Sequence, residues 1–319
     1  MSSRFPSPLT ALRERLRTIA SAVGETRSRV DDTAAQLSAQ IRELQTQLDQ
    51  ATAANQRELA RTREIMRAIC DREPWQRERL RALRERQDYD APFTAPEPLV
   101  SVVIPTFDNH RLLRERAIPS VLAQTYENFE VVVVGDDAPD EARAAVESFA
   151  DPRLHYSNLP YRGPYPADPL SRWYVAGVPP YNEAVRRARG LWIAPLDDDD
   201  AFRPDHIERL LGQAQRERLE LIYGTALRRD PDGATHLLGR FPPEHSEFGL
   251  QSALYHRGIA ELFELELTDA LFELPYDWGL AQRMLRAGVR MSMVAEISVD
   301  YYPSTLWTPR NGDLAAAAQ

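Results

Sequence analysis

The sequence contains no lysine: its 39 basic side chains are all arginine. This excludes the enzyme classes that need a lysine at the reacting centre, such as phosphate-loop NTPases, Schiff-base enzymes and protein kinases. Cys70 is the only cysteine, so neither an intrachain disulfide nor a cluster of thiolate ligands can form. A single cysteine fits a reducing compartment.

Long apolar runs are also lacking. No stretch of about 18 apolar residues could span a bilayer, and the N-terminus has no apolar segment typical of a signal peptide. We therefore expect a cytoplasmic protein without a transmembrane segment, and attachment to the inner membrane face stays open. The net charge of −9 and the pI near 5.3 exclude a general nucleic-acid binder, which neutralises phosphates with a basic face.

The first feature that the sequence does contain is a long helical pattern. Residues 9–86 are rich in Arg, Glu, Gln, Ala and Leu, with one glycine at Gly24 and one proline at Pro74. These are good helix formers, so the sequence predicts one long helix. We expect residues 73–75 to interrupt it, because proline removes a helical hydrogen bond and clashes with the preceding turn.

The apolar residues of this helix form one narrow stripe. They recur at steps of three and four from Leu9 to Ile69, with an extra step of four before Ile41 and before Leu59. Such spacing is typical of a coiled coil with two stutters, and Asn55 lies on the stripe, where a polar residue fixes register and strand number. We predict self-association as a parallel homo-oligomer. The alternative is a helix folded back on the globular domain.

The rest of the chain predicts a globular domain. Residues 88–98 (DYDAPFTAPEP) have the proline content of a linker. The predicted organisation is a disordered tail at 1–8, a coiled-coil helix at 9–87, the linker at 88–98, a globular domain at 99–310 and a tail at 311–319.

Within that domain, strand patterns alternate with helix patterns. Short apolar, β-branched runs occupy residues 99–105, 129–134, 153–156 and 191–196, separated by helix-like segments. This alternation predicts βαβ units and a parallel sheet, in which ligands bind beyond the carboxyl ends of the strands. Polar clusters follow three of these runs, at 106–109, 135–137 and 197–200.

The cluster at 197–200 is four consecutive aspartates. Several carboxylates delivered to one sheet edge suit a hard cation, Mg²⁺ or Mn²⁺. The alternative is a solvated turn that caps the helix starting near Pro204. No G-x-G-x-x-G follows any strand, so a dinucleotide fold is not supported. Acids in place of glycines fit a nucleoside diphosphate bridged by a cation.

Four stretches resemble, in order and spacing, the nucleotide-binding half of the family 2 glycosyltransferases, which have the GT-A fold: residues 102–107, 120–126, 129–137 and 188–200. The resemblance implies an α/β fold with a mostly parallel sheet flanked by helices. It also implies a nucleotide-sugar half at 99–200 and an acceptor half at 201–310.

The resemblance also implies roles for individual residues. The residues expected to contact the nucleotide are Pro105, Thr106, Phe107, Asp108, Asp136, Arg162, Asp197 and Asp198. Of these, Asp136 contacts the base. Asp197 to Asp199 form the D-x-D motif, in which Asp197 lies near the ribose and Asp199 reaches the metal directly. Both are predicted metal-site residues, and Asp200 is left as a helix cap.

Two departures from the family pattern affect these assignments. Asp108 stands where the family usually has Asn, and Gly135-Asp136-Asp137-Ala138 stands where Asp-Asp-Gly-Ser is common. Asp137 is therefore not assigned as a ligand. Arg162 lies in a long loop at 157–180, where the family has a turn near the nucleotide. Loops of this length are usually functional or disordered, and the alternative for Arg162 is a surface guanidinium.

The acceptor half supplies a further acid, Asp277. Residues 275–287 have a helix pattern that Gly288 would end, and an Asp at a helix start is most often an N-cap. However, Asp-Trp-x-Leu-x-x-Arg-Met resembles the family motif whose Asp is the catalytic base, although Tyr276 replaces the frequent Glu. The resemblance therefore implies that Asp277 is the base.

These observations together predict an inverting, metal-dependent glycosyltransferase. The expected donor is a nucleoside diphosphate sugar, a UDP-sugar first, and the expected setting is bacterial surface polysaccharide or glycoconjugate synthesis. The acceptor is an unidentified hydroxyl on a glycan, a lipid-linked glycan or a protein. The alternatives are a sugar nucleotidyltransferase and a catalytically silent coiled-coil scaffold with a nucleotide-binding domain.

Overall fold

The computed structural model describes residues 8–303, and within the first helix it describes the side chains at 12, 13, 15–63, 65, 66 and 72–84. The chain divides into two compact units, residues 1–71 and residues 72–319. Apart from Pro8, the predicted tails at 1–8 and 311–319 lie outside the described residues.

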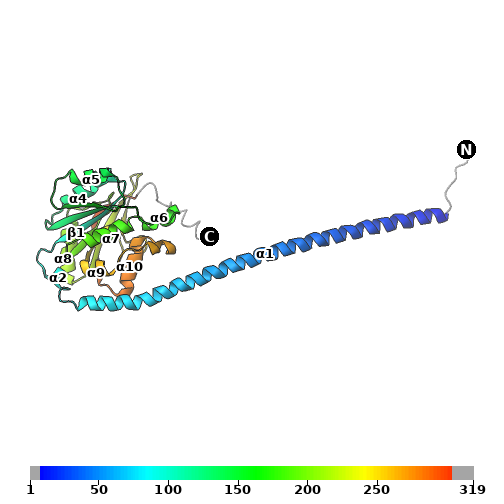
Figure 1. Cartoon of the computed structure of the whole chain (residues 1–319), viewed down its shortest axis with the longest axis horizontal. Coiled ribbons are helices and arrows are strands. Elements are labelled where there is room, and N and C mark those ends of the chain that lie inside the picture. The colour runs from blue at the N-terminus through cyan, green and yellow to red at the C-terminus, as the bar shows by residue number, and fades with distance from the viewer. Residues whose placement is uncertain (1–7, 304–319) are drawn as a thin grey trace. The chain divides into compact units, whose positions relative to one another are not determined.

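Helix α1 confirms the predicted long helix and runs over Pro8–Arg84, 77 residues (Figure 1). The predicted interruption at 73–75 is wrong, because α1 continues through Pro74. A proline costs a helix one hydrogen bond and some crowding, and contacts of the turns on both sides offset that cost. Within residues 8–303, no helix is long and apolar enough to cross a membrane.

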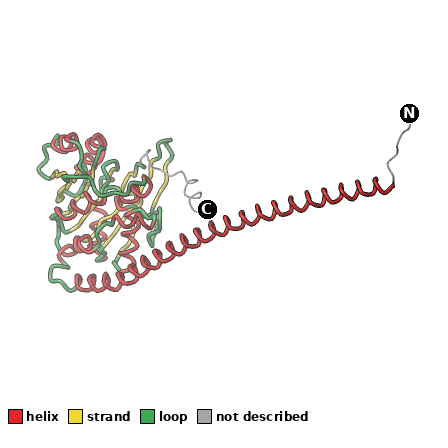
Figure 2. The backbone as a smooth tube through the Cα atoms, turned by 45° about the vertical axis from the view of Figure 1, so that its right-hand side comes forward, coloured by secondary structure: helices red, strands yellow, loops and turns green. Residues whose placement is uncertain are grey.

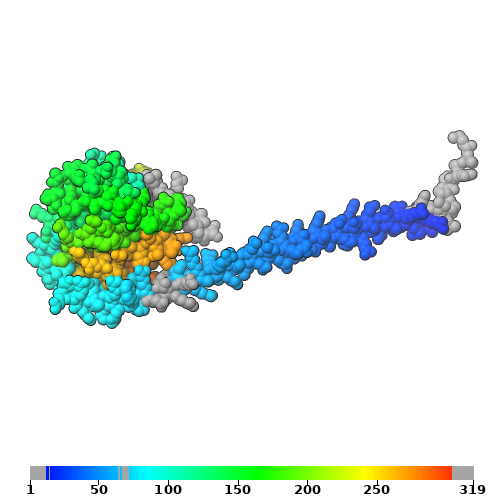
Figure 3. Space-filling view, viewed as in Figure 1, coloured from blue at the N-terminus to red at the C-terminus, as the bar shows by residue number. Residues whose placement is uncertain are grey.

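The last turns of α1 belong to the globular unit. Gln76, Leu80 and Leu83 are buried there. The guanidinium of Arg77 donates to the Arg286 carbonyl at 3.0 Å, and Arg72 pairs with Glu266. In Figure 3 these turns (cyan) lie against the orange part of the chain, which includes α10 (Tyr276–Ala287).

The segment after α1 packs into the same core. It contains the short helix α2 (Ala91–Thr94) and buries Tyr89 and Phe93. The indole N–H of Trp192, a fully buried residue, donates to the Pro92 carbonyl at 3.0 Å. The residues predicted as a linker therefore contribute side chains to the globular core.

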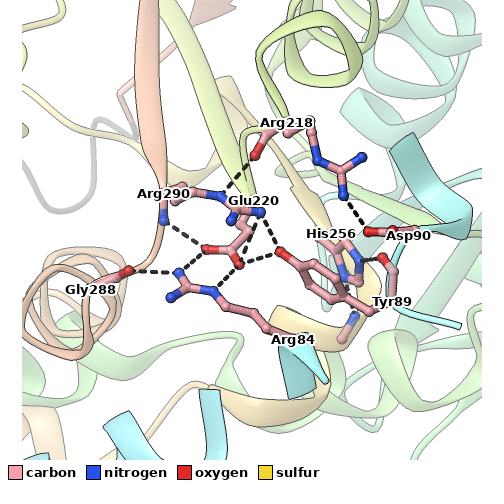
Figure 4. A network of polar contacts seen from close by, with 9 residues as sticks. Arg84, Tyr89, Asp90, Arg218, Glu220, His256, Gly288 and Arg290 are labelled. Atoms are coloured by element: carbon pink, nitrogen blue, oxygen red, sulfur yellow. Dashed lines mark hydrogen bonds and ion pairs between the residues drawn. The ribbon is translucent and has the colours of Figure 1, made fainter. Parts of the chain in front are cut away.

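A buried polar network ties these N-terminal residues to the C-terminal half (Figure 4). The fully buried Glu220 carboxylate accepts two hydrogen bonds from Arg84, both at 2.8 Å, and others from the Tyr89 hydroxyl and the Arg290 amide. Burial alone would raise the pKa of Glu220, but the hydrogen bonds, from Arg84 above all, outweigh it and lower the pKa. A buried carboxylate held by four donors joins both ends of the globular unit.

His256 completes this network. Its Nδ1 accepts from the Gly258 amide at 2.9 Å, so Nε2 carries the proton and donates to the Tyr89 carbonyl at 3.0 Å. The ring stacks on Tyr89 with centroids 5.1 Å apart. His256 is therefore a core residue.

The predicted parallel sheet is confirmed. Strands β1 (Val100–Thr106), β2 (Phe129–Gly135), β3 (Leu154–Asn158) and β4 (Trp192–Pro195) pair in the order β3-β2-β1-β4, all parallel. The helices between them are α3 (His110–Leu112), the π-helix η1 (Leu113–Ala117), α4 (Ile118–Leu122), α5 (Asp140–Glu147), α6 (Pro169–Val175) and α7 (Val178–Arg187).

The sheet continues beyond β4 with mixed pairing. The order extends through β8 (Ala253–His256), β6 (Leu221–Arg229), β9 (Met291–Tyr301) and β5 (Ala201–Phe202), while β7 (Thr235–Leu238) pairs with β6. Strands β4 and β8 are antiparallel, and β6 and β9 are parallel. Figure 2 shows the strands (yellow) running through the globular unit among the helices (red).

The remaining helices are α8 (His206–Glu217), the short η2 (Leu250–Ser252), α9 (Arg257–Leu262), η3 (Leu267–Phe272) and α10 (Tyr276–Ala287). As predicted, α10 ends at Gly288, whose φ of 87° lies in the left-handed region that glycine favours.

Candidate active site

The candidate site lies where β1, β2 and β4 end. In the sheet, Thr106 at the end of β1 is level with Gly135 at the end of β2, and Val103 is level with Pro195 at the end of β4. Since parallel strands end at the same edge, the three polar clusters predicted from the sequence meet there.

Asp198 joins two of these clusters. Its carboxylate is buried and accepts from the Thr106 hydroxyl at 2.6 Å and from the Asn109 amide at 2.9 Å. Burial raises the pKa of Asp198, and these two hydrogen bonds oppose the rise. Asp108, which the sequence assigned to the nucleotide, is exposed at the same sheet edge.

The other three aspartates of the run lie close together. Burial, and then the charges of Asp199 and Asp198, raise the pKa of Asp197 to about 8. Burial and the Asp198 charge raise the pKa of Asp199 to about 6. Burial and the charges of Asp197 and Asp199 raise the pKa of Asp200. Carboxylates crowded in this way repel one another when they are ionised, and a bound cation would relieve that repulsion.

Asp200 is not the helix cap that the sequence left open. Helix α8 starts at His206, with Asp205 at its N-cap position. One oxygen of Asp200 accepts from the Tyr302 amide at 2.7 Å, and the other is buried and finds no partner among residues 8–303. A buried carboxylate oxygen without a donor costs free energy, which a cation or a ligand would recover.

The acid run can contribute to a metal site but does not form one by itself. Among the described residues, no three His, Cys, Asp or Glu side chains are arranged to hold an ion. Mg²⁺ and Mn²⁺ commonly bind through one or two carboxylates and take their other ligands from water and substrate phosphates. The free oxygen of Asp200 and the crowding of Asp197 and Asp199 fit such a partial site.

The segment predicted as a long loop at 157–180 contains the end of β3, the helix α6 and the start of α7, and its residues 163–165 pack onto the end of β2. Both oxygens of the buried Asp136 accept from it: one from the Gly163 amide at 3.0 Å, the other from the Tyr165 hydroxyl at 2.7 Å. The Gly177 amide in turn donates to the Tyr165 hydroxyl at 3.2 Å. The loop is therefore ordered by the acid that the sequence assigned to the base.

Arg162 lies at this edge, and its side chain is 42% exposed. Its guanidinium lies 3.3 Å above the centre of the Phe107 ring and 3.9 Å from the Asp136 carboxylate. Pro105 is half-buried beside them at the end of β1. The structure thus brings together four of the predicted nucleotide residues: Pro105, Phe107, Asp136 and Arg162.

Asp277 reaches the site from the other half of the sheet. It lies in the first turn of α10, whose N-cap is Pro275, so the N-cap alternative is not supported. Burial raises the pKa of Asp277 to about 6, and its charge raises the pKa of Asp197. A hydrogen bond from Tyr276 to Asp197 opposes that rise. Helix α10 therefore brings a carboxylate with a raised pKa next to the acid run.

Ser120 and Gln124 belong to the stretches that resemble the family, and in the structure they make hydrogen bonds within the protein. The Ser120 hydroxyl accepts from the Phe202 amide at 3.1 Å. Gln124 accepts from the Ile207 amide at 3.1 Å and donates to the Arg203 carbonyl at 2.7 Å. They hold the chain that follows the acid run in place.

Comparison with known proteins identifies the family. The sequence profile described as glycosyl transferase family 2 matches residues 101–167 and 180–262. The chain belongs to glycosyl transferase family 2. The matched residues include Asp136, Arg162 and the acid run, whereas Asp277 lies beyond them.

Curated relatives of this family 2 chain include a succinoglycan biosynthesis protein, ExoO, from Rhizobium meliloti, 29% identical over 59% of this chain and 56% of the relative. Another is WfgD from Escherichia coli, named a UDP-Glc:alpha-D-GlcNAc-diphosphoundecaprenol beta-1,3-glucosyltransferase, 30% identical over 40% of this chain and 45% of the relative. The chain thus spans about half the length of these relatives.

The fold also matches a solved structure. Residues 1–349 of S. aureus TarS superpose with a TM-score of 0.50 at 17% identity, covering 64% of this chain and 60% of that one. At this identity the match shows the fold alone, and it supports the GT-A fold expected for family 2.

Proposed function

We propose that this chain transfers a sugar from a nucleoside diphosphate sugar to an acceptor hydroxyl, with inversion at the anomeric carbon and dependence on Mg²⁺ or Mn²⁺. One observation carries the proposal: the charge of Asp277, from the proposed acceptor half, acts on Asp197 in the acid run, and the neighbouring Tyr276 hydrogen-bonds Asp197, although the two segments are far apart in sequence. Two groups of carboxylates at one point allow one group to serve the donor and the other the acceptor.

The proposed donor is a UDP-sugar, bound across residues 99–200. Asp136 uses its two oxygens for Gly163 and Tyr165, but a carboxylate offers about four acceptor positions, so it can also accept from the imide N–H of uracil. Arg162 and Phe107 form a flat surface beside it that suits a base. The donor in the printed name of the relative WfgD is UDP-Glc.

The proposed base is Asp277. Its raised pKa, about 6, leaves it ionised at neutral pH and more basic than an ordinary aspartate. It takes the proton of the acceptor hydroxyl while that oxygen forms a bond to the anomeric carbon and the bond from that carbon to the diphosphate oxygen breaks. Attack opposite the leaving group inverts the anomeric centre.

Asp199 and Asp197 are the proposed metal-site residues, with the free oxygen of Asp200 close by. A divalent cation there would neutralise charge on the departing nucleoside diphosphate. The protein's own contribution is to hold the acid run rigid: Thr106 and Asn109 fix Asp198, and Tyr302 fixes Asp200.

Nucleotide binding tests this part of the proposal. We expect calorimetry to detect UDP binding with Mn²⁺ that is lost in excess chelator and in Asp199→Asn. Asp137→Asn is the matched control, since Asp137 is exposed at the same sheet edge and its φ of 54° suits asparagine. Equal UDP affinity with and without chelator would contradict the proposed cation bridge. A set of nucleotide sugars, assayed for slow hydrolysis with Mn²⁺, would then identify the donor.

We also propose that residues 9–71 pair with a second copy as a parallel coiled coil. Eleven large apolar side chains of α1 are 53% to 66% exposed: Leu12, Leu16, Ile19, Val23, Val30, Leu37, Ile41, Leu44, Leu48, Leu59 and Met66. A helix with so narrow an apolar stripe gains its stability from a partner.

Polar residues on the stripe are compatible with pairing. The hydroxyls of Thr26 and Thr33 donate to the carbonyls of Ala22 and Arg29 at 2.7 and 2.8 Å, which leaves their methyl groups to face an apolar seam. In a parallel pair, Glu58 of one helix faces Arg63 of the other across the seam, where e and g charges pair.

The buried residues near the end of α1 limit how far along the helix a second copy can pair. The steps of three and four continue from Leu59 through Gln76, Leu80 and Leu83, but the last three are buried in the globular unit. A second copy can therefore pair with the stripe only before Gln76.

Sedimentation of the full chain tests the assembly. Ile41→Glu combined with Leu44→Glu should abolish the oligomer, because charges on the seam would lose hydration. Thr46→Glu, on the opposite face, is the matched control and should keep it. An unchanged oligomer in the double variant would contradict the coiled-coil proposal.

For the whole protein we propose a role in bacterial surface polysaccharide or glycoconjugate synthesis. The support is that the relative ExoO is named for succinoglycan biosynthesis. The proposed catalytic domain is residues 99–310, with the acceptor half at 201–310.

A further inference from the structure

A single arginine outside all the predicted motifs lies against the acid run. Arg116 belongs to the π-helix η1, and its Nη1 donates to the Asp199 carbonyl oxygen at 2.5 Å. Its guanidinium lies 3.6 Å above the centre of the Tyr302 ring. Tyr302 is the residue whose amide holds Asp200. Arg116 therefore contacts Asp199 directly and Asp200 through Tyr302.

The position of Arg116 is fixed by its neighbours. Leu113 and Ala117 of the same π-helix are buried, and Ser120, in the next turn, is bonded to the chain that leaves the acid run. The wide turn of a π-helix is rare and often occurs at functional sites. The guanidinium is thus held next to Asp199 by the core beneath it.

Among residues 8–303, no carboxylate lies within ion-pair distance of the Arg116 guanidinium, although its charge opposes the rise in the pKa of Asp199 and of Asp200. Its contacts are a carbonyl oxygen and an aromatic face. Arg162, the other guanidinium at this sheet edge, lies beside the Asp136 carboxylate. Guanidinium has five donors in a planar fork that matches a phosphate group, and one suffices for the Asp199 carbonyl.

We propose that Arg116 binds the diphosphate of the nucleotide donor directly. The inference rests on the proposed function. A nucleoside diphosphate carries more negative charge than one divalent cation balances, and the acid run adds still more. A second fixed positive charge beside Asp199 supplies the balance, and it also stabilises the diphosphate as it leaves. Arg162 holds the base end and Arg116 the phosphate end of the same ligand.

The test separates the two ends of the ligand. We expect Arg116→Gln in the full chain to weaken UDP binding, measured with Mn²⁺, by about 10- to 100-fold, the usual effect of losing a charged hydrogen bond. The affinity for uridine, measured by saturation-transfer NMR, should stay unchanged because uridine has no phosphate. Arg116→Lys keeps a charge and should recover part of the UDP affinity. Arg114→Gln, an exposed arginine of the same π-helix, is the matched control and should bind UDP as the native chain does.

Four outcomes are informative. A selective loss of UDP affinity in Arg116→Gln supports the inference. Equal losses for UDP and uridine would mean that Arg116 only supports the fold of the site, and an unchanged UDP affinity would mean that it does not touch the phosphates; either result overturns the inference. If the native chain itself fails to bind UDP with Mn²⁺, the proposed UDP donor fails first, and the inference about Arg116 fails with it.

Discussion

The Glu220 network makes a quantitative prediction about how the end of α1 holds the globular unit together. Arg84→Met removes the guanidinium that donates two hydrogen bonds to Glu220 and a third, at 2.8 Å, to the Gly288 carbonyl. Glu220 is fully buried, so the substitution leaves a carboxylate in the core that has lost its two guanidinium hydrogen bonds and keeps only the more distant guanidinium of Arg290, 3.6 Å away. Removing one partner of a buried ion pair typically costs about 3 to 5 kcal/mol.

The assay is thermal unfolding of the full chain, monitored by tryptophan fluorescence. For a unit of this size, we expect the midpoint of thermal unfolding to fall by about 6 to 20 °C, at ~2 to 4 °C per kcal/mol. Arg81→Met is the matched control: Arg81 pairs with Glu78 one turn earlier in the same helix, but both side chains are about 70% exposed. Such surface pairs contribute about 0 to 1 kcal/mol.

A second variant tests the cause. Adding Glu220→Gln to Arg84→Met removes the unpaired charge and should recover at least ~1 kcal/mol of the lost stability. If Arg84→Met were no more destabilising than Arg81→Met, the network would not be what anchors α1 to the globular unit, and the reasoning would be refuted.

Three further predictions concern stability and assembly. Burial lowers the pKa of His206 to about 3 in the folded state, so below pH 6.5 the unfolded state binds a proton that the folded state does not. Between pH 6.5 and 4.5 the unfolding free energy of the wild-type chain should therefore fall by about 2 kcal/mol more than that of His206→Gln. Equal losses would contradict this. Gly279→Ala should lower the unfolding free energy by about 1 to 3 kcal/mol, because a Cβ there would meet the Asp269 carboxylate at 2.4 Å. Gly24→Ala, which has open space around it, should leave the unfolding free energy unchanged or raise it in the same thermal denaturation. Asn55→Leu should raise the thermal stability of the oligomer and relax its strand number in sedimentation equilibrium, whereas a less stable oligomer would place Asn55 off the seam.

The first half of the globular unit was predictable because its signals are local. Runs such as residues 129–134 are apolar and β-branched, so they form buried parallel strands, and the acids that follow them necessarily lie at one edge. The residues that shape the site were not predictable in this way. The partners of Asp136 lie in the loop at 157–180, and a contact across so many residues leaves no periodic trace in the sequence.

The second half of the globular unit was less predictable, because its strands pair in ways that leave no pattern in the sequence. Strand β6 is antiparallel to β8 and parallel to β9, with irregular register beside Gly224. The helix beyond Pro74 was missed for a related reason. Burial of Leu80 and Leu83 against the globular unit outweighs the local cost of the proline. The position of Arg116 against the acid run carried no signal in the sequence, because it depends on a π-helix and on Tyr302.

The central claim is that Asp277 acts as the base on a sugar donor held at the acid run. The most direct measurement compares the native chain with Asp277→Asn, in nucleotide-sugar binding and in hydrolysis without acceptor, with water as the attacking hydroxyl. The account predicts unchanged donor affinity and a rate lower by about 10²- to 10⁴-fold, the usual contribution of a general base. Hydrolysis by Asp277→Asn at the native rate would contradict it.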